Sequence, residues 1–370
     1  MSELYVGLMS GTSLDGVDAV LADFAHRPAT VLGHCSAPLP SALKEALLAL
    51  NAPGDNELHH AALAANALVH IYAEQVHTLL QECGVSPKAV RAIGAHGQTV
   101  RHRPQEFDGT GYTLQLNNPA LLAELCGVDV VADFRSRDVA AGGQGAPLVP
   151  PFHQAFFGRP DRVLAVLNIG GISNITVLDP AAPALCGFDC GPGNALMDAW
   201  CLAHTGQVFD DAGRWAAQGT VHATLLDRLL NEPFFAKAPP KSTGRDLFNG
   251  PWLSNHLEGL SDIAPQDVQT TLTELTALAC ARSVRASCPG CSALVVCGGG
   301  ALNDYLMARL QTALPDCQVA SSDAFGLPPL QVEATAFAWL ARQAVLRQTA
   351  SVAGVTGAQG ARVLGGIYPA

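Results

Sequence analysis

The chain has 370 residues, of which 49% are hydrophobic and 14% charged, and its formal net charge is −11. This length exceeds that of one usual domain and predicts two lobes. The acidic balance argues against a sequence-independent nucleic-acid binder, because such proteins neutralise phosphates with clustered Lys and Arg. The sequence has no apolar run of about eighteen residues and no basic-then-apolar N-terminus, so a cytoplasmic location is expected.

Eleven cysteines are spread over apparent core segments, which is typical of reduced thiols used as small hydrophobic residues. Cys288 and Cys291 stand in a Cys-Pro-Gly-Cys segment, which taken alone resembles a redox or half-zinc motif. No second pair lies at zinc-finger spacing, and Pro-Gly makes a good turn between a helix and the strand predicted from Leu294. A structural turn is therefore the favoured interpretation.

The first predicted element is a strand, a polar turn and a second strand over residues 4–21, where apolar runs flank a segment rich in Gly, Ser and Thr. The small hydroxyls and open backbone N–H groups of this turn suit an anion such as a phosphate. Asp15 and Asp18 add carboxylates suited to a magnesium ion or its waters. An ordinary hairpin with a Ser- and Gly-rich turn is the alternative.

Residues 90–95 predict a further strand, and His96, Gln98 and Thr99 follow at its C-terminal end. Open α/β sheets bind their ligands at such ends. Gln98 and Thr99 beside a glycine are suited to hydrogen bonds with a sugar, whereas His96 alone is as readily explained as a turn residue.

Asn118 as N-cap and Pro119 at the first helical position predict a helix that stops near Gly127. A strand over residues 128–132 then leads into the charged segment 133–138. One of Arg135 or Arg137 is expected to contact a carboxylate or phosphate through two hydrogen bonds. The alternative is a salt-bridged surface loop.

The Gly-rich segment 140–147, followed by two prolines, predicts the passage between the lobes. The N-terminal lobe is expected to comprise residues 1–140, with residues 345–370 packing back on it, and the C-terminal lobe residues 141–344. The second lobe opens with another strand-turn-strand pattern over residues 163–179, with Gly170 and Gly171 in its turn. A third Gly-rich turn over residues 298–303 follows a strand and leads into a helix.

Two acidic residues stand out in the second half of the chain. Asp189 lies in a Gly-rich segment before a predicted helix, where it can be held toward a substrate or can simply cap the helix. Glu333 begins the helical run 333–346, where a favourable charge at a helix N-terminus is the simpler explanation. The segment 241–246 is basic and rich in hydroxyls, and is a weak candidate for phosphate contacts.

Seven motifs follow one another along essentially the whole chain, at residues 10–16, 96–99, 133–135, 142–148, 168–171, 187–194 and 297–300. Together they resemble the anhydro-N-acetylmuramic acid kinase family. The resemblance implies an α/β, two-lobed actin-like ATPase (ribonuclease H-like) fold with a β-hairpin phosphate clamp in each lobe. It also implies a homodimer.

The chemistry implied by the resemblance is a coupled reaction within peptidoglycan recycling. Water opens the 1,6-anhydro bridge of 1,6-anhydro-N-acetylmuramic acid, while the freed O6 takes the γ-phosphate of ATP in the presence of Mg²⁺. The product is N-acetylmuramic acid 6-phosphate.

The resemblance also implies roles for residues that occupy the motif positions. Asp189 would be the base that activates water. The ATP site would comprise Gly11, Thr12, Ser13, Leu14, Asp15, Gly16, Val17 and Asp18, together with Gly170, Gly171, Gly298, Gly299 and Gly300. The sugar would be lined by Gln98, Thr99, Asp133, Arg135 and Glu333, with Arg135 near its carboxylate. Asp15 and Asp18 would hold Mg²⁺, directly or through water.

Two other functions compete with this interpretation. A filament-forming or otherwise non-catalytic actin-like ATPase would release ADP without the anhydrosugar, whereas a kinase should depend on it. A serine hydrolase that uses Ser13 is disfavoured, because the segment lacks Gly-x-Ser-x-Gly and lies between two strands.

Overall fold

The computed structural model describes residues 2–11, 14–244, 246–260 and 262–370. The chain divides into two compact units, each with its own mixed β-sheet. The first unit holds the residues up to Phe156 together with Gln331–Ala370, and the second holds Phe157–Leu330. None of the helices in the described ranges is long and apolar enough to cross a membrane.

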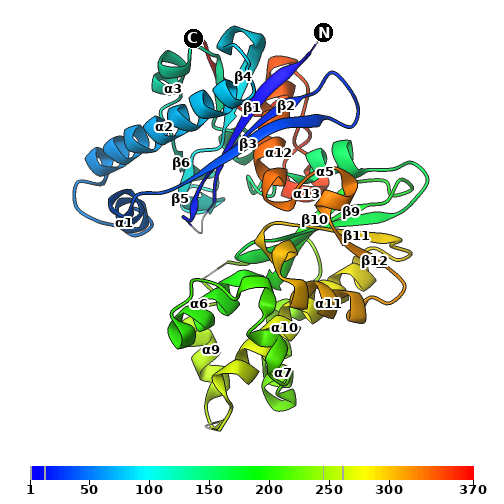
Figure 1. The fold of residues 1–370 in the computed structure, drawn as a ribbon. Helices are drawn as coiled ribbons and strands as arrows, with labels where there is room; N and C mark the ends of the chain where they lie inside the picture. Colours follow the sequence, from blue (N-terminus) through cyan, green and yellow to red (C-terminus); the bar gives the residue numbers. More distant parts are fainter. Residues whose placement is uncertain (1, 12–13, 245, 261) are drawn as a thin grey trace. The chain divides into compact units, whose positions relative to one another are not determined.

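The sheet of the first unit has the strand order β13-β7-β4-β1-β2-β3 (Figure 1). Its first two strands form the predicted hairpin, in antiparallel register from Leu4 opposite Asp23 to Ser10 opposite Val17. Strands β1, β4 and β7 run parallel, so their C-terminal ends meet at one edge of the sheet. The strands are β1 Leu4–Ser10, β2 Gly16–Asp23, β3 Thr30–Pro38, β4 Val90–Ala95, β7 Val130–Ala132 and β13 Gly366–Tyr368.

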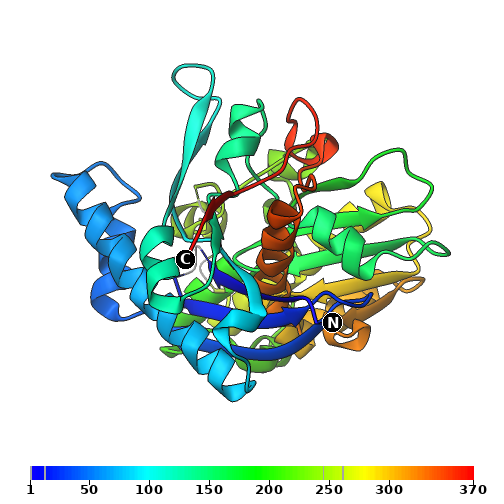
Figure 2. The same ribbon diagram turned by 90° about the horizontal axis from the view of Figure 1, so that it is seen from above.

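Helices cover both faces of this sheet, and a separate β-ribbon projects from it (Figure 2). Leu68 and Tyr72 of α2 are buried in one core, whereas Phe337 and Ala341 of α12 are buried in the core on the other face. The ribbon pairs β5 Gln98–Pro104 with β6 Gly111–Leu116. The helices are α1 Ser41–Ala49, α2 Glu57–Glu82, α3 Pro119–Cys126, α4 Ser136–Ala140, α5 Pro150–Phe157, α12 Val332–Val345 and α13 Ala353–Thr356.

Helix α12 lies with its backbone directly against strands β1 and β4. A Cβ atom added at Gly7 would collide with the carbonyl oxygen of Ala334, and one added at Gly94 would collide with that of Phe337. Two glycines on neighbouring strands therefore allow an approach that no other residue type would permit.

The second unit has a five-stranded sheet in the order β10-β9-β8-β11-β12. The predicted second hairpin is formed by β8 Leu164–Ile169 and β9 Ile172–Leu178, which leaves Gly170 and Gly171 as its turn. The remaining strands are β10 Cys186–Pro192, β11 Ala293–Cys297 and β12 Gln318–Ser321. The helices are α6 Asn194–Thr205, α7 Ala223–Leu230, α8 Pro233–Ala236, α9 Gly250–Leu257, α10 Pro265–Ser287 and α11 Asp304–Ala313.

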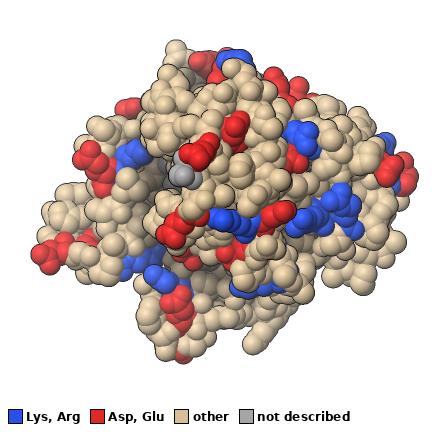
Figure 3. All heavy atoms as spheres, turned by 90° about the horizontal axis from the view of Figure 1, so that it is seen from below, with Lys and Arg blue, Asp and Glu red and all other residues tan. Residues whose placement is uncertain are grey.

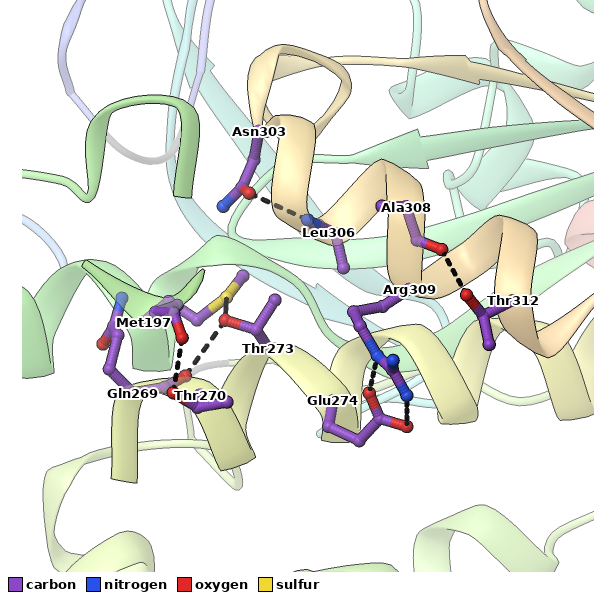
Figure 4. Close-up of polar contacts among 11 residues, drawn as sticks. Met197, Gln269, Thr270, Thr273, Glu274, Asn303, Leu306, Ala308, Arg309 and Thr312 are labelled. Atoms are coloured by element: carbon purple, nitrogen blue, oxygen red, sulfur yellow. Dashed lines mark hydrogen bonds and ion pairs between the residues drawn. The ribbon is translucent and has the colours of Figure 1, made fainter. Parts of the chain in front are cut away.

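Polar contacts join α10 to α11 (Figure 4). The Arg309 guanidinium donates from Nε and Nη2 to the two carboxylate oxygens of Glu274, at 2.6 and 3.0 Å. The Glu274 carboxylate raises the pKa of Arg309 through this contact. Asn303 caps α11 by accepting from the Leu306 N–H at 2.9 Å. These contacts hold the start of α11, and hence the Gly-rich turn before it, in place.

Several local predictions are confirmed at residue level. The Asn118 side chain accepts from the Leu121 N–H and caps α3, whose first residue is Pro119. Cys288 ends α10, and the Pro-Gly turn leads to β11, so the Cys-Pro-Gly-Cys segment is a turn. Most of the cysteines are buried, among them Cys126, Cys190 and Cys280, as expected of small hydrophobic residues.

The two units meet at residues 156/157 and 330/331, whereas the lobe boundaries were expected at 140/141 and 344/345. The Gly-rich segment 140–147 lies inside the first unit, because the buried Asp138 carboxylate accepts from the Gly145 N–H and the Thr356 hydroxyl, each at 2.8 Å. Residues 331–344 also belong to the first unit, because α12 packs on its sheet. At the C-terminal end of the chain, β13 pairs with β7.

The surface shows no large area of one charge on the face drawn in Figure 3. Basic and acidic side chains are interspersed there, and uncharged residues make up most of that face. This distribution agrees with the low content of charged residues, 14%, in the sequence.

Replacing Gly7 with Ala should destabilise the first unit by about 1–3 kcal/mol or more, because the new methyl group would push α12 away from β1. Gly54→Ala is the matched control, since a Cβ at Gly54 would have open space around it. Denaturant unfolding of both variants would measure the difference. Equal stabilities would show that the close approach of α12 does not support the fold.

Candidate active site

The turn of the first hairpin is tied to the start of the β5–β6 ribbon. The Leu14 N–H donates to the Gly11 carbonyl at 3.1 Å, and the Gln98 amide donates to the same carbonyl at 3.1 Å. Leu14 is buried with a φ of 59°. Thr12 and Ser13, two of the predicted ATP contacts, lie outside the described residues. Gln98 therefore holds the turn in place with the amide that was expected to contact a sugar.

Two carboxylates of the hairpin were predicted to hold a metal ion. Asp15 is exposed, and Asp18 is partly buried with its Oδ1 3.1 Å from His34 Nε2. No group of three or more His, Cys, Asp or Glu side chains able to hold a metal ion occurs in the described part of the chain. Mg²⁺ commonly takes one or two carboxylates together with phosphate oxygens and water, and Asp15 and Asp18 fit that requirement.

Arg135 meets His96 at the edge formed by the ends of β4 and β7. The guanidinium donates from Nε and Nη2 to His96 Nε2, at 3.2 and 2.9 Å, and from Nη1 to the Gly145 carbonyl at 2.8 Å. Burial and the neighbouring Arg135 charge lower the pKa of His96 to about 3, so its ring is neutral and Nε2 is an acceptor. The expected contact between Arg135 and a carboxylate remains a prediction, and the alternative of a salt-bridged surface loop does not describe these contacts.

The guanidinium has five N–H donors, and the three bonds above use three of them. Among the described residues, one donor on Nη1 and one on Nη2 have no further hydrogen bond. Burial lowers the pKa of Arg135 to about 10, with Glu333 and Asp138 opposing the effect, and the side chain stays cationic at neutral pH. Such a pair of donors on a held cation can bind both oxygens of a carboxylate.

Glu333 lies in the first turn of α12, as the sequence suggested. Burial raises the pKa of its carboxyl; the charge of Arg135 opposes this rise and that of Asp18 adds to it. The structure thus places Arg135 and Asp18 each within electrostatic range of Glu333. Asp133 is exposed and follows β7 with a φ of 58°, and Thr99 accepts from the Gln115 amide at 3.2 Å.

The turn of the second hairpin rests on the start of α6. The Asn194 N–H donates to the Gly170 carbonyl at 2.7 Å, and the Gly193 N–H donates to the Gly171 carbonyl at 2.9 Å. Backbone groups of the turn thus satisfy N–H groups at the helix start that have no partner within the helix.

The third Gly-rich turn lies at the end of β8. Gly298 has a φ of 78°, and a Cβ there would approach the Asn168 side-chain oxygen at 2.5 Å and the Ile169 carbonyl at 2.7 Å. Gly299 and Gly300 then form the start of a short 3₁₀ turn before α11. The backbone of this turn therefore packs directly against the end of β8, in the second hairpin.

Asp189 does not cap a helix. It lies inside β10, opposite Asn174, and the N-cap of α6 is Gly193, four residues further on. Its Oδ2 accepts from the Thr243 N–H at 2.9 Å, and its own N–H donates to the Lys241 carbonyl at 3.1 Å. The alternative of a capping residue is therefore excluded, because the strand continues through the Gly-rich segment to Pro192.

Burial raises the pKa of Asp189 to about 6, while the Thr243 N–H and the Lys241 charge act in the opposite direction. At neutral pH the group is mostly a carboxylate whose affinity for a proton is higher than usual. A group of this kind can act as a general base near neutral pH. The basic segment 241–246 was noted only as a weak phosphate contact, and nothing in the sequence connected it with Asp189, which lies 54 residues from Thr243.

Known proteins resemble this chain in sequence and in fold. A family model described as anhydro-N-acetylmuramic acid kinase matches residues 3–370. The protein of that name from Albidiferax ferrireducens is 64% identical over 389 residues, covering 100% of each chain. The one from Variovorax paradoxus is 62% identical over 372 residues, covering 100% of this chain and 99% of its own.

The solved structure of (R)-2-hydroxyglutaryl-CoA dehydratase component A from Acidaminococcus fermentans has a TM-score of 0.51 with this chain, at 11% identity. The likeness covers 91% of this chain and 96% of that one, and it concerns the fold. The two mixed sheets and the paired hairpins give the chain an α/β, two-lobed actin-like ATPase fold. By its sequence, the chain belongs to the anhydro-N-acetylmuramic acid kinase family.

The neutral state of His96 predicts a loss of stability in mild acid. Its pKa is about 3 in the native protein, against an ordinary value of 6.5, so the unfolded chain takes up a proton that the native chain does not. Stability should fall as the pH drops below about 6.5, by about 2 kcal/mol at pH 5 from this group alone. Denaturant unfolding at pH 7 and pH 5 should show a smaller loss for His96→Gln than for the wild type. An equal loss in both would mean that His96 is protonated in the native state.

Proposed function

We propose that this chain is an ATP-dependent kinase that hydrolytically opens 1,6-anhydro-N-acetylmuramic acid and phosphorylates it at O6. Water adds to the anomeric carbon, the bond from that carbon to O6 breaks, and O6 takes the γ-phosphate of ATP. The products are N-acetylmuramic acid 6-phosphate and ADP. Membership of the kinase family supports the reaction, and the carboxylate of Asp189 is the observation that carries its chemistry.

Asp189 is the proposed general base. Its carboxylate is held by the Thr243 N–H, and burial raises its pKa to about 6, close to the pH at which a base is most effective. The proton of the attacking water would pass to this carboxylate. Glu333, whose pKa is also raised by burial, is the next candidate for that role.

The proposed sugar site draws on the first unit. Arg135 would bind the sugar carboxylate with the two N–H groups that its bonds to His96 and Gly145 leave over. Glu333 stands within the field of Arg135 and would accept from a sugar hydroxyl. Gln98, Thr99 and Asp133 are the other proposed contacts.

The proposed ATP site uses the backbone of both hairpin turns and of the turn after β11. The residues are Gly11, Thr12, Ser13, Leu14, Asp15, Gly16, Val17, Asp18, Gly170, Gly171, Gly298, Gly299 and Gly300. Asp15 and Asp18 would hold Mg²⁺, which offsets phosphate charge when bound. We further propose a homodimer and a cytoplasmic location, the latter supported by the use of cysteines as small buried side chains.

Asp189→Asn tests the base directly. Asn has nearly the same shape and can still accept from the Thr243 N–H, but it cannot take a proton from water. We expect a melting temperature close to that of the wild type, retained binding of ATP and sugar, and a 10²- to 10⁴-fold lower kcat, the usual contribution of a general base. ADP release with and without the anhydrosugar is measured in parallel. A near-normal kcat would move the role to Glu333, and sugar-independent ADP release would favour an ATPase instead.

Arg135→Ala should raise the KM for the sugar by roughly 10- to 100-fold while the KM for ATP changes little. The lost contact is a charge-assisted hydrogen bond of about 1.5–3 kcal/mol. Arg137→Ala is the matched control, because that side chain is exposed two residues away. Arg135→Lys keeps the charge without the paired donors and should fall between the two. A rise in the KM for ATP alone would assign Arg135 to the nucleotide.

A further inference from the structure

A short segment of the second unit runs along the outer edge of the sheet at Asp189. Strand β10 is the last strand on its side of the sheet, so its outer backbone groups need partners from elsewhere. The Asp189 N–H donates to the Lys241 carbonyl at 3.1 Å, and the Thr243 N–H donates to Asp189 Oδ2 at 2.9 Å. Residues 241–243 therefore hold both the backbone and the side chain of Asp189.

The Lys241 side chain anchors this segment. Its ammonium group donates to the Phe234 and Phe235 carbonyls, at 3.3 Å each, near the end of α8. It also lies 4.7 Å from the centre of the Phe234 ring and 6.0 Å from that of Phe188, the residue before Asp189. Carbonyl oxygens and aromatic faces both attract a cation. Since Phe234 is buried, the anchor point belongs to the core of the unit.

We propose that Lys241 is a positioning residue for the reaction, because its anchored side chain keeps the Thr243 N–H and a positive charge beside the carboxylate of Asp189. The proposal rests on the proposed role of Asp189 as the base. Lys241 itself need not touch the substrate or the transferred phosphate.

The electrostatics of the neighbourhood agree with this geometry. Asn174 faces Asp189 from β9 and is neutral. Cys190 follows on β10, and burial raises the pKa of its thiol so that it also stays neutral. Burial lowers the pKa of Lys241, and the charge of Lys237, which lies before this segment, lowers it further, while Asp189 acts in the opposite direction. The ammonium of Lys241 is thus a cation that acts on Asp189 and favours its charged form.

Substitutions at Lys241 can be accommodated. The side chain lines a cavity of about 370 Å³, together with Phe188, Phe235, Lys237 and Arg282. Met has a similar length without the charge, and Arg keeps the charge, so both should fit this space. Lys237 lines the same cavity from an exposed position and provides a matched control.

The test is the pH dependence of kcat at saturating ATP and anhydrosugar. In the wild type kcat should fall on the acid side, as Asp189 takes up a proton. In Lys241→Met the pKa of Asp189 should rise, so this acid limb should move to higher pH by on the order of one unit. Lys241→Arg should restore the wild-type profile, and Lys237→Met should leave it unchanged. Lys241→Gln provides a second uncharged variant if the Met variant does not fold.

The outcomes separate the two proposals. A role in stability alone would lower the melting temperature and reduce kcat by the same factor at every pH, which would overturn the assignment of Lys241. The assignment of Lys241 would also be overturned if the acid limb of kcat did not move in folded Lys241→Met or Lys241→Gln. If Asp189→Asn were inactive at the same time, Asp189 would remain the base. A near-normal kcat in Asp189→Asn would instead overturn the base, and the role of Lys241 with it.

Discussion

The contact of helix α12 with strands β1 and β4 is the constraint on which the first unit depends. Gly7 and Gly94 lack the side chains that would hold the helix at an ordinary helix–sheet distance. The helix therefore brings residues 331–345 back to a sheet that began at residue 4, and the whole of the second unit is inserted between the two parts of the first. The same contact places Glu333, in the first turn of α12, within the field of Arg135 and Asp18.

In each unit, a charged candidate residue is partly buried and is held by neutral or backbone partners. Arg135 is held by a neutral imidazole and a carbonyl, which bind its donors without cancelling its charge. Asp189 is held by a backbone N–H, with the Lys241 ammonium nearby. A direct ion pair would use the hydrogen-bonding atoms of each group and offset its charge. The partners seen here leave some of those atoms available to a ligand. In an acidic protein, such local arrangements let a cationic site persist against the overall charge.

The sequence predicted much of the fold because the signals were local. Strand pairing across the first hairpin, the Asn118 cap with Pro119, and the Cys-Pro-Gly-Cys turn each depend on residues a few positions apart. The lobe boundary was predicted less closely, since the Gly-rich segment that suggested a linker is bound through Asp138 and Thr356, which are 218 residues apart. The alternative that Asp189 caps a helix stayed open in the sequence for a related reason, because glycines near a strand end resemble a turn when the pairing strand is unknown.

The order of the motifs along the chain was enough to identify the family, the two hairpins and the residues proposed for the site, since motif spacing and turn chemistry are written in short stretches of sequence. Tertiary structure alone decided which partners those residues have. His96 meets Arg135 across 39 residues, and Thr243 meets Asp189 across 54. Hydrogen bonds between distant segments depend on how the strands are ordered and how closely helices approach them. No local pattern of residue types encodes that geometry, so the environment that sets the charge and orientation of each group appears only once the chain is folded.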